Sequence, residues 1–483
     1  MKNLQKTDPQ IYNLVLKEER RIKNTLELIP SNNFPSKAVL EALGTIFNYK
    51  YSEGYPGRRY YQGQEFADYV ETLAQERAKK LFGVPYVNVQ ALSGSPANMA
   101  VYFALLNPGD TLMGLKLGFG GHLTHGLPLN ISGKFYRSVQ YELQKDGSLD
   151  FDAIEKMAFK EKPKLIICGF TAFPRVIDFK KFADIADKVG AYLMADIAHI
   201  AGLVVAGVHP SPVSYAHIVT TTTHKTLRGP RGALIMVTQK GLQKNPDLPK
   251  KIDSAIIPGL QGGPHDNQTA AIAVSLKEAA TPAFRTYGKQ IVKNSKALAA
   301  ALIKYQFDLV SGGTDNHLIL IDLRNKKING AVAALALEVS GIVTNKNAVP
   351  NDVLPPFYPS GVRIGTPAVT TRGMKEREMV KIARFINQAL EEVKGEIMPT
   401  TDKEARSKFW KDFKSRVKKN KNLLAIKKEV TATVTSSGTN LTFLSPVSVI
   451  TLSFLASTSR AADCPAPSIR ISGARATPCF TNS

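Results

Sequence analysis

The stretch DFKKFADIADKVGAYLMADIAH, residues 178–199, joins an amphipathic helical pattern to a short apolar run that reads as a strand. The same alternation continues on both sides of it. We predict strands at YVNVQAL, TLMGL, KLIICGF, HIVTTTTHK and GALIMV, and helices at VETLAQERAKKLFG and SPANMAVYFALL. Strands separated by helices predict βαβ units, and therefore an α/β fold with a largely parallel sheet covered by helices on both faces.

The 483 residues, 43% of them hydrophobic, are enough for more than one domain. We expect an N-terminal arm at 1–45, a large domain at 46–280 and a smaller C-terminal α/β domain at 281–430. The smaller domain is predicted from a long helix at about 281, read over KEAATPAFRTYGKQIVKNSKALAAALIKYQF (277–307), and from the strand HLILIDL and two later helices. Residues 431–483 are rich in Ser, Thr, Pro and Ala. We interpret them as a disordered tail or as residues from outside the ancestral frame, with a small added module as the third reading.

The formal net charge of +23 leaves two interpretations open. Solvated helix faces together with anionic small ligands are one, and a nucleic-acid site in the lysine-rich segment 403–428 is the other. The three cysteines, Cys168, Cys464 and Cys479, have no metal-binding or disulfide spacing, so we predict no metal and a reducing compartment. Without a secretory signal or a run of about 20 apolar residues, we expect a cytoplasmic protein with no membrane span.

One lysine, Lys225, ends a β-branched run in VTTTTHKTLRGPRG, residues 219–232. Lysine is a covalent catalyst only when its amine is neutral and meets an aldehyde. Burial at a strand end, with Arg228 and Arg231 nearby, would lower the pKa of this amine. The alternative is an ordinary exposed lysine at a glycine turn.

A second motif, ADIAHIAG at 195–202, places Asp196 and His199 where a strand opens into a loop. An aspartate at such a position can keep a pyridinium nitrogen protonated, as pyridoxal chemistry requires. An aspartate that caps the loop, beside a core histidine, is the other reading.

A third motif, LSGSPANMA at 92–100, follows a strand and opens a helix. Ser93, Gly94 and Ser95 could surround a phosphate with hydroxyls and backbone N–H groups, or Ser93 could simply cap the helix.

Three further motifs supply other contacts. FGGHLTHG at 119–126 offers an imidazole that could stack on an aromatic cofactor, GLQGGPHDN at 259–267 suits close backbone approach, and Arg363 in SGVRIGTPA could bind a carboxylate bidentately. An imine-forming lysine, a strand-end aspartate, a phosphate cradle and a stacking histidine are together what pyridoxal phosphate requires.

These motifs, with ELIPSNNF (27–34), YSEGYPGRRYYQG (51–63) and TNKNAVPND (344–352), occur in the order typical of serine hydroxymethyltransferases. The resemblance runs from about residue 27 to about 395. It implies a fold-type I pyridoxal phosphate enzyme that transfers the hydroxymethyl group of L-serine reversibly to tetrahydrofolate, giving glycine and 5,10-methylenetetrahydrofolate. A threonine aldolase of the same fold is the nearest alternative activity.

The resemblance also implies roles for individual residues. Lys225 is expected to form the internal aldimine, His224 to influence specificity, and Glu53 to transfer protons. The expected cofactor-binding residues are Ser93, Gly94, Ser95, His122, Thr171, Asp196, His199, Lys225, Arg231, Gly262 and Gly263. The expected substrate-binding residues are Ser31, Tyr51, Glu53, Tyr61 and Arg363. The expected folate-binding residues are Leu117, Gly121, His122, Leu123, Asn347, Pro355, Pro356 and Phe357.

The resemblance places Gly262 and Gly263 in contact with the cofactor of a neighbouring subunit, which implies a homodimer or a larger homo-oligomer. One motif departs from the family pattern. Asn32 stands where the family usually has a glutamate, so an amide replaces a charge beside the expected site.

Overall fold

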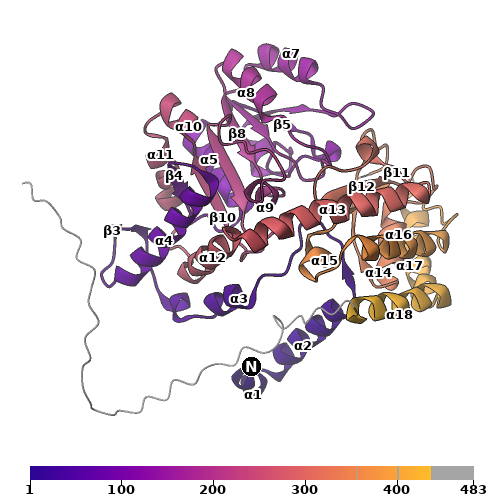
Figure 1. Ribbon diagram of the computed structural model, residues 1–483. Helices are drawn as coiled ribbons and strands as arrows, with labels where there is room; N and C mark the ends of the chain where they lie inside the picture. Colours follow the sequence, from indigo (N-terminus) through magenta and orange to yellow (C-terminus); the bar gives the residue numbers. More distant parts are fainter. Residues whose placement is uncertain (356, 400–401, 437–483) are drawn as a thin grey trace, which may run out of the picture. The chain divides into compact units, whose positions relative to one another are not determined.

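The computed structural model describes residues 1–355, 357–399 and 402–436 (Figure 1). From Lys2 onward the described residues belong to one compact unit. Two β-sheets organise this unit, and each has its own apolar core.

The larger sheet has seven strands in the order β4-β10-β9-β8-β7-β5-β6. Six of them share one direction, and β10 runs antiparallel to both of its neighbours. The strands are β4 (Tyr86–Asn88), β5 (Thr111–Leu115), β6 (Arg137–Tyr141), β7 (Leu165–Cys168), β8 (Tyr192–Asp196), β9 (Ile218–Thr222) and β10 (Ala233–Val237).

Helices cover both faces of this sheet because its strands are apolar on both sides (Figure 1). In β7, Leu165 and Ile167 join one core, while Ile166 and Cys168 join the core on the opposite face. On the first face lie α5 (Gly94–Leu105) and α11 (Leu248–Ser254). On the other lie α4 (Glu65–Phe82), α7 (Phe151–Glu161), α8 (Phe179–Lys188), α9 (Ala201–Val205) and α12 (Asp266–Ala279).

Helix α8 and strand β8 form as their sequence predicts. The Asp178 side chain caps α8 by accepting a hydrogen bond from the Lys181 N–H at 3.1 Å. The apolar stripe of α8, which includes Phe182 and Ile185, is buried against the sheet. Gly190 then takes a left-handed turn (φ 72°) into β8, whose last residue is Asp196.

The smaller sheet has four antiparallel strands in the order β11-β12-β15-β14. They are β11 (Asp308–Leu309), β12 (Leu318–Asp322), β15 (Gly361–Gly365) and β14 (Asn345–Asn347). The helices of this part are α13 (Pro282–Lys304), α14 (Gly330–Val339), α15 (Pro367–Thr371), α16 (Glu376–Glu391), α17 (Lys403–Val417) and α18 (Lys421–Ser436).

The remaining elements are short or belong to the N-terminal segment. The helices are α1 (Lys2–Thr7), α2 (Pro9–Lys23), α3 (Lys37–Leu43), α6 (Ile131–Phe135) and α10 (Gln239–Lys244). The helical turns are η1 (Ile46–Tyr49), η2 (Leu117–Phe119), η3 (Ala255–Leu260) and η4 (Val310–Gly312). Two strand pairs complete the fold, β1 (Leu26–Glu27) with β13 (Ile342–Val343), and β2 (Gly54–Tyr55) with β3 (Arg58–Arg59).

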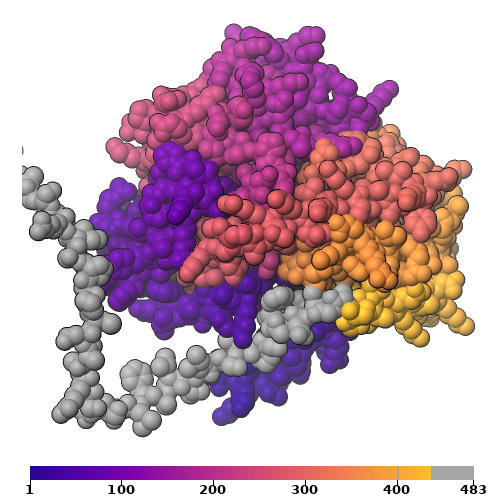
Figure 2. Space-filling model, in the orientation of Figure 1, coloured from indigo at the N-terminus to yellow at the C-terminus, as the bar shows by residue number. Residues whose placement is uncertain are grey.

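The lysine-rich segment 403–428 is packed against the second core. Phe413, Val417, Leu423 and Ile426 are buried there, and the segment's lysines face solvent on the surface coloured yellow in Figure 2. Helix α18 runs past residue 430 to Ser436, into the segment that the sequence assigns to the tail. The rest of that predicted tail, 437–483, lies outside the described residues.

The predicted fold class is confirmed, with two differences in detail. The edge strand β6 was not predicted, and the helix expected across residue 281 is interrupted, because Thr281 caps a new helix that has Pro282 at its first position. The predicted boundary at 280–281 falls in that break, and the division into domains stays a prediction. Within the part of the chain that the structure describes, no helix is long and apolar enough to cross a membrane.

Candidate active site

A cavity of about 280 Å³ opens beyond the carboxyl ends of β8 and β9, where ligands collect in parallel sheets. Twelve of the predicted residues line it: Ser31, Ser93, Gly94, Ser95, His122, Thr171, Asp196, His199, His224, Lys225, Arg231 and Arg363. They come from segments far apart in the sequence, so their convergence is a property of the fold.

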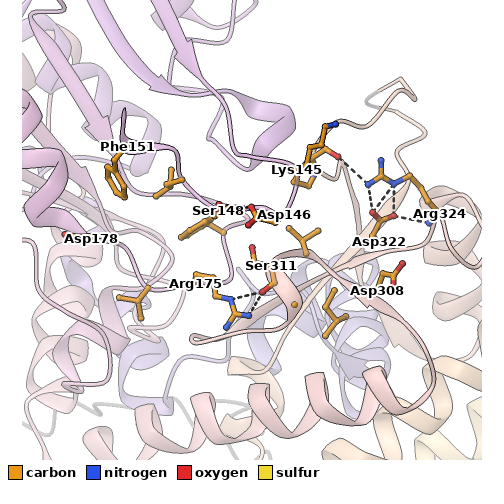
Figure 3. A pocket seen from close by; sticks show the side chains of 17 residues that line it. Lys145, Asp146, Ser148, Phe151, Arg175, Asp178, Asp308, Ser311, Asp322 and Arg324 are labelled. Atoms are coloured by element: carbon orange, nitrogen blue, oxygen red, sulfur yellow. Dashed lines mark hydrogen bonds and ion pairs between the residues drawn. The ribbon is translucent and has the colours of Figure 1, made fainter. Parts of the chain in front are cut away.

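A larger cavity of about 610 Å³ lies elsewhere, between the loop at 145–151 and the strand ends of the smaller sheet (Figure 3). Its main charged groups are already paired. Arg175 Nη1 lies 3.0 Å from the Asp315 carboxylate, and Arg324 Nη2 lies 2.5 Å from that of Asp322. It contains none of the predicted site residues, so the smaller cavity is the candidate site.

Lys225 reaches the cavity from the turn after β9. Burial, together with the Arg363 and Arg231 cations and against the opposing effect of Asp196, lowers the pKa of its amine to about 8. The expected contribution of Arg228 is wrong, because its guanidinium lies over the Tyr287 ring, 5.0 Å from the ring centroid. The sequence therefore identified the correct direction of the pKa shift but one incorrect source.

We expect the reactivity of Lys225 toward an aldehyde to follow this pKa. The neutral fraction should rise about tenfold per pH unit below pH 8 and level off above it, whereas an ordinary lysine keeps gaining neutral amine up to about pH 10.5. Borohydride trapping of pyridoxal on the cofactor-free chain, followed by peptide mapping, measures this profile at Lys225. Nα-acetyl-lysine, which keeps a free side-chain amine, is the control under the same conditions. If Lys225 showed the same pH profile as this control, the assignment of a lowered pKa to Lys225 would be wrong.

Asp196 is held as a carboxylate at the bottom of the cavity. Burial alone would raise its pKa, but the hydrogen bond and the charge of His125 lower the pKa below its ordinary value. Asp196 Oδ2 lies 3.2 Å from His125 Nε2 and accepts a hydrogen bond from Asn98 Nδ2 at 2.8 Å, while Oδ1 accepts one from the Ala198 N–H at 3.0 Å. An anion fixed in this way can stabilise a positive charge on a ligand ring nitrogen.

His125 and Asn98 were not predicted as site residues, although both lie inside quoted motifs, GGHLTHG and SGSPANMA. Only the fold brings them to Asp196. Gly169 is part of the same arrangement. It has a φ of 115°, and a Cβ there would lie 1.9 Å from the Asp196 carbonyl oxygen, so only glycine allows the loop after β7 to approach.

The predicted phosphate cradle lies at the N-terminus of the twelve-residue helix α5. Ser93 occupies the N-cap position of this helix, but its side chain makes no capping hydrogen bond, so its hydroxyl is available to a ligand. A Cβ at Gly94 would lie 2.7 Å from Thr222 Cγ2, which explains the glycine there. The uncapped N–H groups and the helix dipole favour an anion.

Arg363 contributes a buried cation from the middle of the smaller sheet. Its side chain donates from Nη1 to the Thr171 carbonyl, and its Nε has no partner. Burial lowers its pKa to about 10, and no acidic side chain among the described residues opposes that shift. A buried guanidinium without a counter-ion is suited to bind a carboxylate from a ligand.

Two imidazoles in the cavity are kept neutral by burial. The pKa of His122 falls to about 4, and that of His224 falls to about 3. His122 Nδ1 is anchored 2.8 Å from Thr124 Oγ1, while His224 Nδ1 is buried without a partner. Because these imidazole rings are uncharged, the nearby cations do not repel them, and the rings can pack against an aromatic ligand.

Asn32 also lines the cavity and hydrogen-bonds with Glu27, a carboxylate that is only 6% exposed. Burial raises the pKa of Glu27, and the contacts with the Ile29 N–H and Asn32 partly oppose this rise. A glutamate at position 32 would place a second carboxylate beside Glu27. The Asn32 amide avoids repulsion between two carboxylates, and it gives the cavity wall one negative charge fewer than a glutamate would.

The remaining predicted residues do not line this cavity. Tyr51, Glu53, Tyr61, Gly262 and Gly263 form a separate exposed cluster. A Cβ at Gly262 would lie 3.2 Å from Glu53 Oε1, and one at Gly263 would lie 3.1 Å from the Tyr51 ring. The Tyr61 hydroxyl donates to Glu53 Oε2 at 2.7 Å. The side chains of Tyr51 and Tyr61 are 66% and 44% exposed, so this cluster faces outward.

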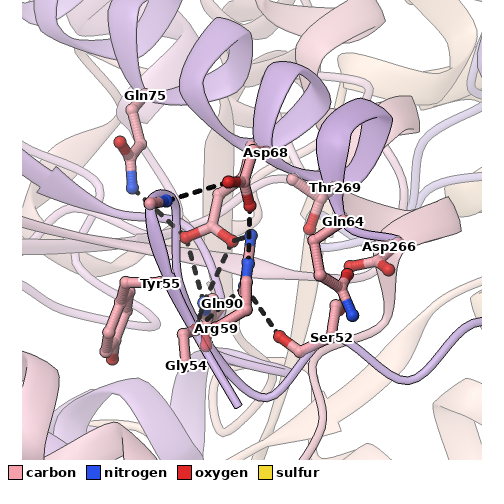
Figure 4. A network of polar contacts seen from close by, with 12 residues as sticks. Ser52, Gly54, Tyr55, Arg59, Gln64, Asp68, Gln75, Gln90, Asp266 and Thr269 are labelled. Carbon is pink, nitrogen blue, oxygen red and sulfur yellow. Dashed lines mark hydrogen bonds and ion pairs between the residues drawn. The ribbon is translucent and has the colours of Figure 1, made fainter. Parts of the chain in front are cut away.

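A buried ion network holds Glu53 in place (Figure 4). Arg59 Nη1 donates to the carbonyls on both sides of Glu53, those of Ser52 at 2.7 Å and Gly54 at 2.9 Å. Its Nε and Nη2 pair with Asp68 at 2.8 Å and with Glu71 at 2.6 Å. The partly exposed Glu53 carboxylate is therefore mounted on a rigid turn.

The predicted folate-binding residues lie outside the cavity lining, with the exception of His122. Leu123 and Phe357 are 47% and 75% exposed, Asn347 is in β14, and Leu117 is in η2. Gly121 is buried, Pro355 is exposed, and Pro356 lies outside the described residues. A folate site at these positions stays a prediction.

Comparisons with known proteins point to one family. Residues 4–386 match the family model described as serine hydroxymethyltransferase. A protein of that name from Acidothermus cellulolyticus is 57% identical over 383 residues, which cover 79% of this chain and 88% of that protein. Another from Desulfotalea psychrophila is 54% identical over 390 residues, which cover 81% of this chain and 90% of the relative.

Proposed function

The chain belongs to the serine hydroxymethyltransferase family, and we propose that its active site is completed by two copies of the chain. The enzyme transfers the hydroxymethyl group of L-serine reversibly to tetrahydrofolate, giving glycine and 5,10-methylenetetrahydrofolate. We infer a site shared by two copies from one observation. Glu53, Tyr51 and Tyr61 lie apart from the cavity that contains Lys225.

The cavity residues fit pyridoxal 5′-phosphate. Ser93, Gly94 and Ser95 would hold the phosphate at the uncapped end of α5, with Arg231 as a nearby cation, and Asp196 would hold a proton at the ring nitrogen. Lys225 would hold the cofactor through its neutral amine, and His122 would lie on the ring face. When bound, the cofactor supplies an electron sink that eases breaking of a bond at the amino-acid Cα.

Other residues of the chain would bind the amino acid and transfer its proton. Arg363 would bind the serine carboxylate and so orient the amino acid. Glu53 of the second copy would move the proton of the serine hydroxyl oxygen, with Tyr61 holding its carboxylate. Gly262 and Gly263 lie beside Glu53 and Tyr51, so they would approach the same cavity from the second copy.

A cytoplasmic homodimer, or a larger oligomer built from such dimers, agrees with this scheme. The side chains of Tyr49, Tyr60, Phe66 and Tyr69, which are near Glu53 in the sequence, are exposed and would be covered by the second copy. A closed two-fold pair would create two equivalent sites.

Mixing two inactive variants tests the shared site. A dimer of Lys225→Ala with Glu53→Gln contains one doubly altered site and one intact site, so co-refolded variants should regain roughly a quarter of wild-type activity. The assay is glycine formation from L-serine with and without tetrahydrofolate. Each variant alone is the control.

Three results would contradict the proposals. No recovery on mixing would mean that each chain completes its own site. Threonine cleavage without folate-stimulated serine turnover by the wild type would favour an aldolase, and salt-sensitive RNA binding that survives Lys225→Ala would favour the nucleic-acid alternative.

A further inference from the structure

His317, the first residue of the predicted strand HLILIDL and not among the predicted site residues, contacts His199 in the wall of the cavity. His199 Nδ1 lies 3.3 Å from His317 Nε2, and the two rings are stacked with centroids 5.5 Å apart and planes 28° apart. Both side chains are buried, at 4% and 0% exposure. The contact joins the loop after β8 to the residue that precedes β12, so it links the two sheets.

Both imidazoles are neutral at physiological pH. Burial, helped by the Arg363 and Lys225 cations, lowers the pKa of His317 to about 3, and burial with the same two cations lowers the pKa of His199 well below its ordinary value. A contact between two neutral imidazole nitrogens needs one N–H and one bare nitrogen. Either His317 Nε2 donates to His199 Nδ1, or His199 Nδ1 donates to His317 Nε2.

The surroundings of His317 decide between these arrangements. Its other nitrogen, Nδ1, is buried and has no hydrogen-bond partner. If His199 were the donor, His317 would carry its proton on that Nδ1, leaving a buried N–H without an acceptor. If His317 is the donor, only a lone pair is unsatisfied, and both rings adopt the Nε2–H form that neutral histidine intrinsically prefers. The second arrangement is the more stable one.

We propose that His317 is a positioning residue that fixes the tautomer of His199, so that His199 presents an Nε2–H donor to an oxygen of the ligand in the cavity. His199 lines that cavity, and its Nδ1 is occupied by His317, which leaves Nε2 for the ligand. The identity of the acceptor rests on the proposed function, in which it is the ring oxygen of pyridoxal 5′-phosphate. The tautomer itself does not depend on the cofactor.

Nitrogen-15 NMR of the full chain without cofactor tests the tautomer directly. With labelled histidine, and with the His199 signals assigned by their loss in His199→Gln, wild-type His199 should be protonated at Nε2. In His317→Phe, which keeps a ring but has no donor, His199 should become a mixture of tautomers. In His317→Gln, whose amide can donate, the Nε2–H form should persist. Protonation of wild-type His199 at Nδ1 would overturn the proposal, as would an unchanged tautomer in His317→Phe.

Cofactor binding gives a second measurement. We expect the Kd for pyridoxal 5′-phosphate, measured by visible absorbance, to rise about tenfold in His317→Phe and to stay within about twofold in His317→Gln. Thermal unfolding of each variant reports on folding. Equal loss of affinity in both variants would mean that His317 only fills space, which contradicts the positioning role. Failure of the wild type to bind the cofactor would contradict the proposed function, and the NMR result would stand independently.

Discussion

Lys225→Ala is expected to abolish the visible absorbance that arises from the covalent link between lysine and cofactor, and to lower serine turnover at least about 10³-fold. Lys225 is the lysine among the residues that line the cavity, and its pKa of about 8 makes its amine about half neutral at pH 8 and mostly neutral above it. Without it, the cofactor has no covalent attachment to the chain. Absorbance spectra and folate-dependent glycine formation, recorded on the same preparations, measure both effects.

Lys244→Ala is the matched control for this substitution. Lys244 is exposed, but its surroundings also desolvate the amine and lower its pKa, and its Nζ donates to the carbonyls of Gly190 at 3.0 Å and Ala191 at 2.9 Å, away from the cavity. Its loss should leave absorbance and turnover within about twofold of wild type. A Lys225→Ala protein that stays coloured and active would remove Lys225 from the site.

The sequence predicted the central sheet because most of its strands are short, apolar and bounded by turns. Strand β5 has the predicted residues, and β7, β8, β9 and β10 lie within the predicted ones. Strand β6, Arg137–Tyr141, escaped prediction because it lies at the sheet edge and its Arg, Ser and Gln residues give it little apolar character. Local pattern reveals buried strands more readily than edge strands.

The candidate site was predictable where local chemistry and strand ends coincide, as they do for Lys225 and Asp196. The partners of Asp196 were not, because Asn98 and His125 are separated from it by 98 and 71 residues in sequence and only folding brings them close. His317 was missed for the same reason. The outward position of Glu53 could not be read from the residues either, since it depends on how the Arg59 network orients the turn.

Arg363→Ala is expected to lower kcat/KM for L-serine by about 10²- to 10³-fold, mainly through KM. Removing one partner of a buried charge pair costs roughly 2–5 kcal/mol, and here the partner is the serine carboxylate. Arg363 is 8% exposed, and its Nε has no hydrogen-bond partner. Among the described residues, no acidic side chain pairs with this guanidinium, so it can pair with the carboxylate of a ligand. Arg363→Lys keeps the charge but loses the planar two-point contact, so it should lose about tenfold or more.

Arg372→Lys is the control that distinguishes a loss of serine binding from a loss of packing in the fold. Arg372 is also buried, at 1% exposure, but its guanidinium donates to the carbonyls of Thr25 at 3.1 Å and Ile22 at 2.6 Å, and so joins the N-terminal segment to α15. We expect this variant to lower the melting temperature while KM for serine stays within about twofold. Steady-state kinetics with thermal unfolding of all three variants provides the measurement. If Arg363→Ala destabilised the fold like Arg372→Lys and left KM unchanged, Arg363 would be a structural arginine, and the carboxylate of serine would have to bind elsewhere.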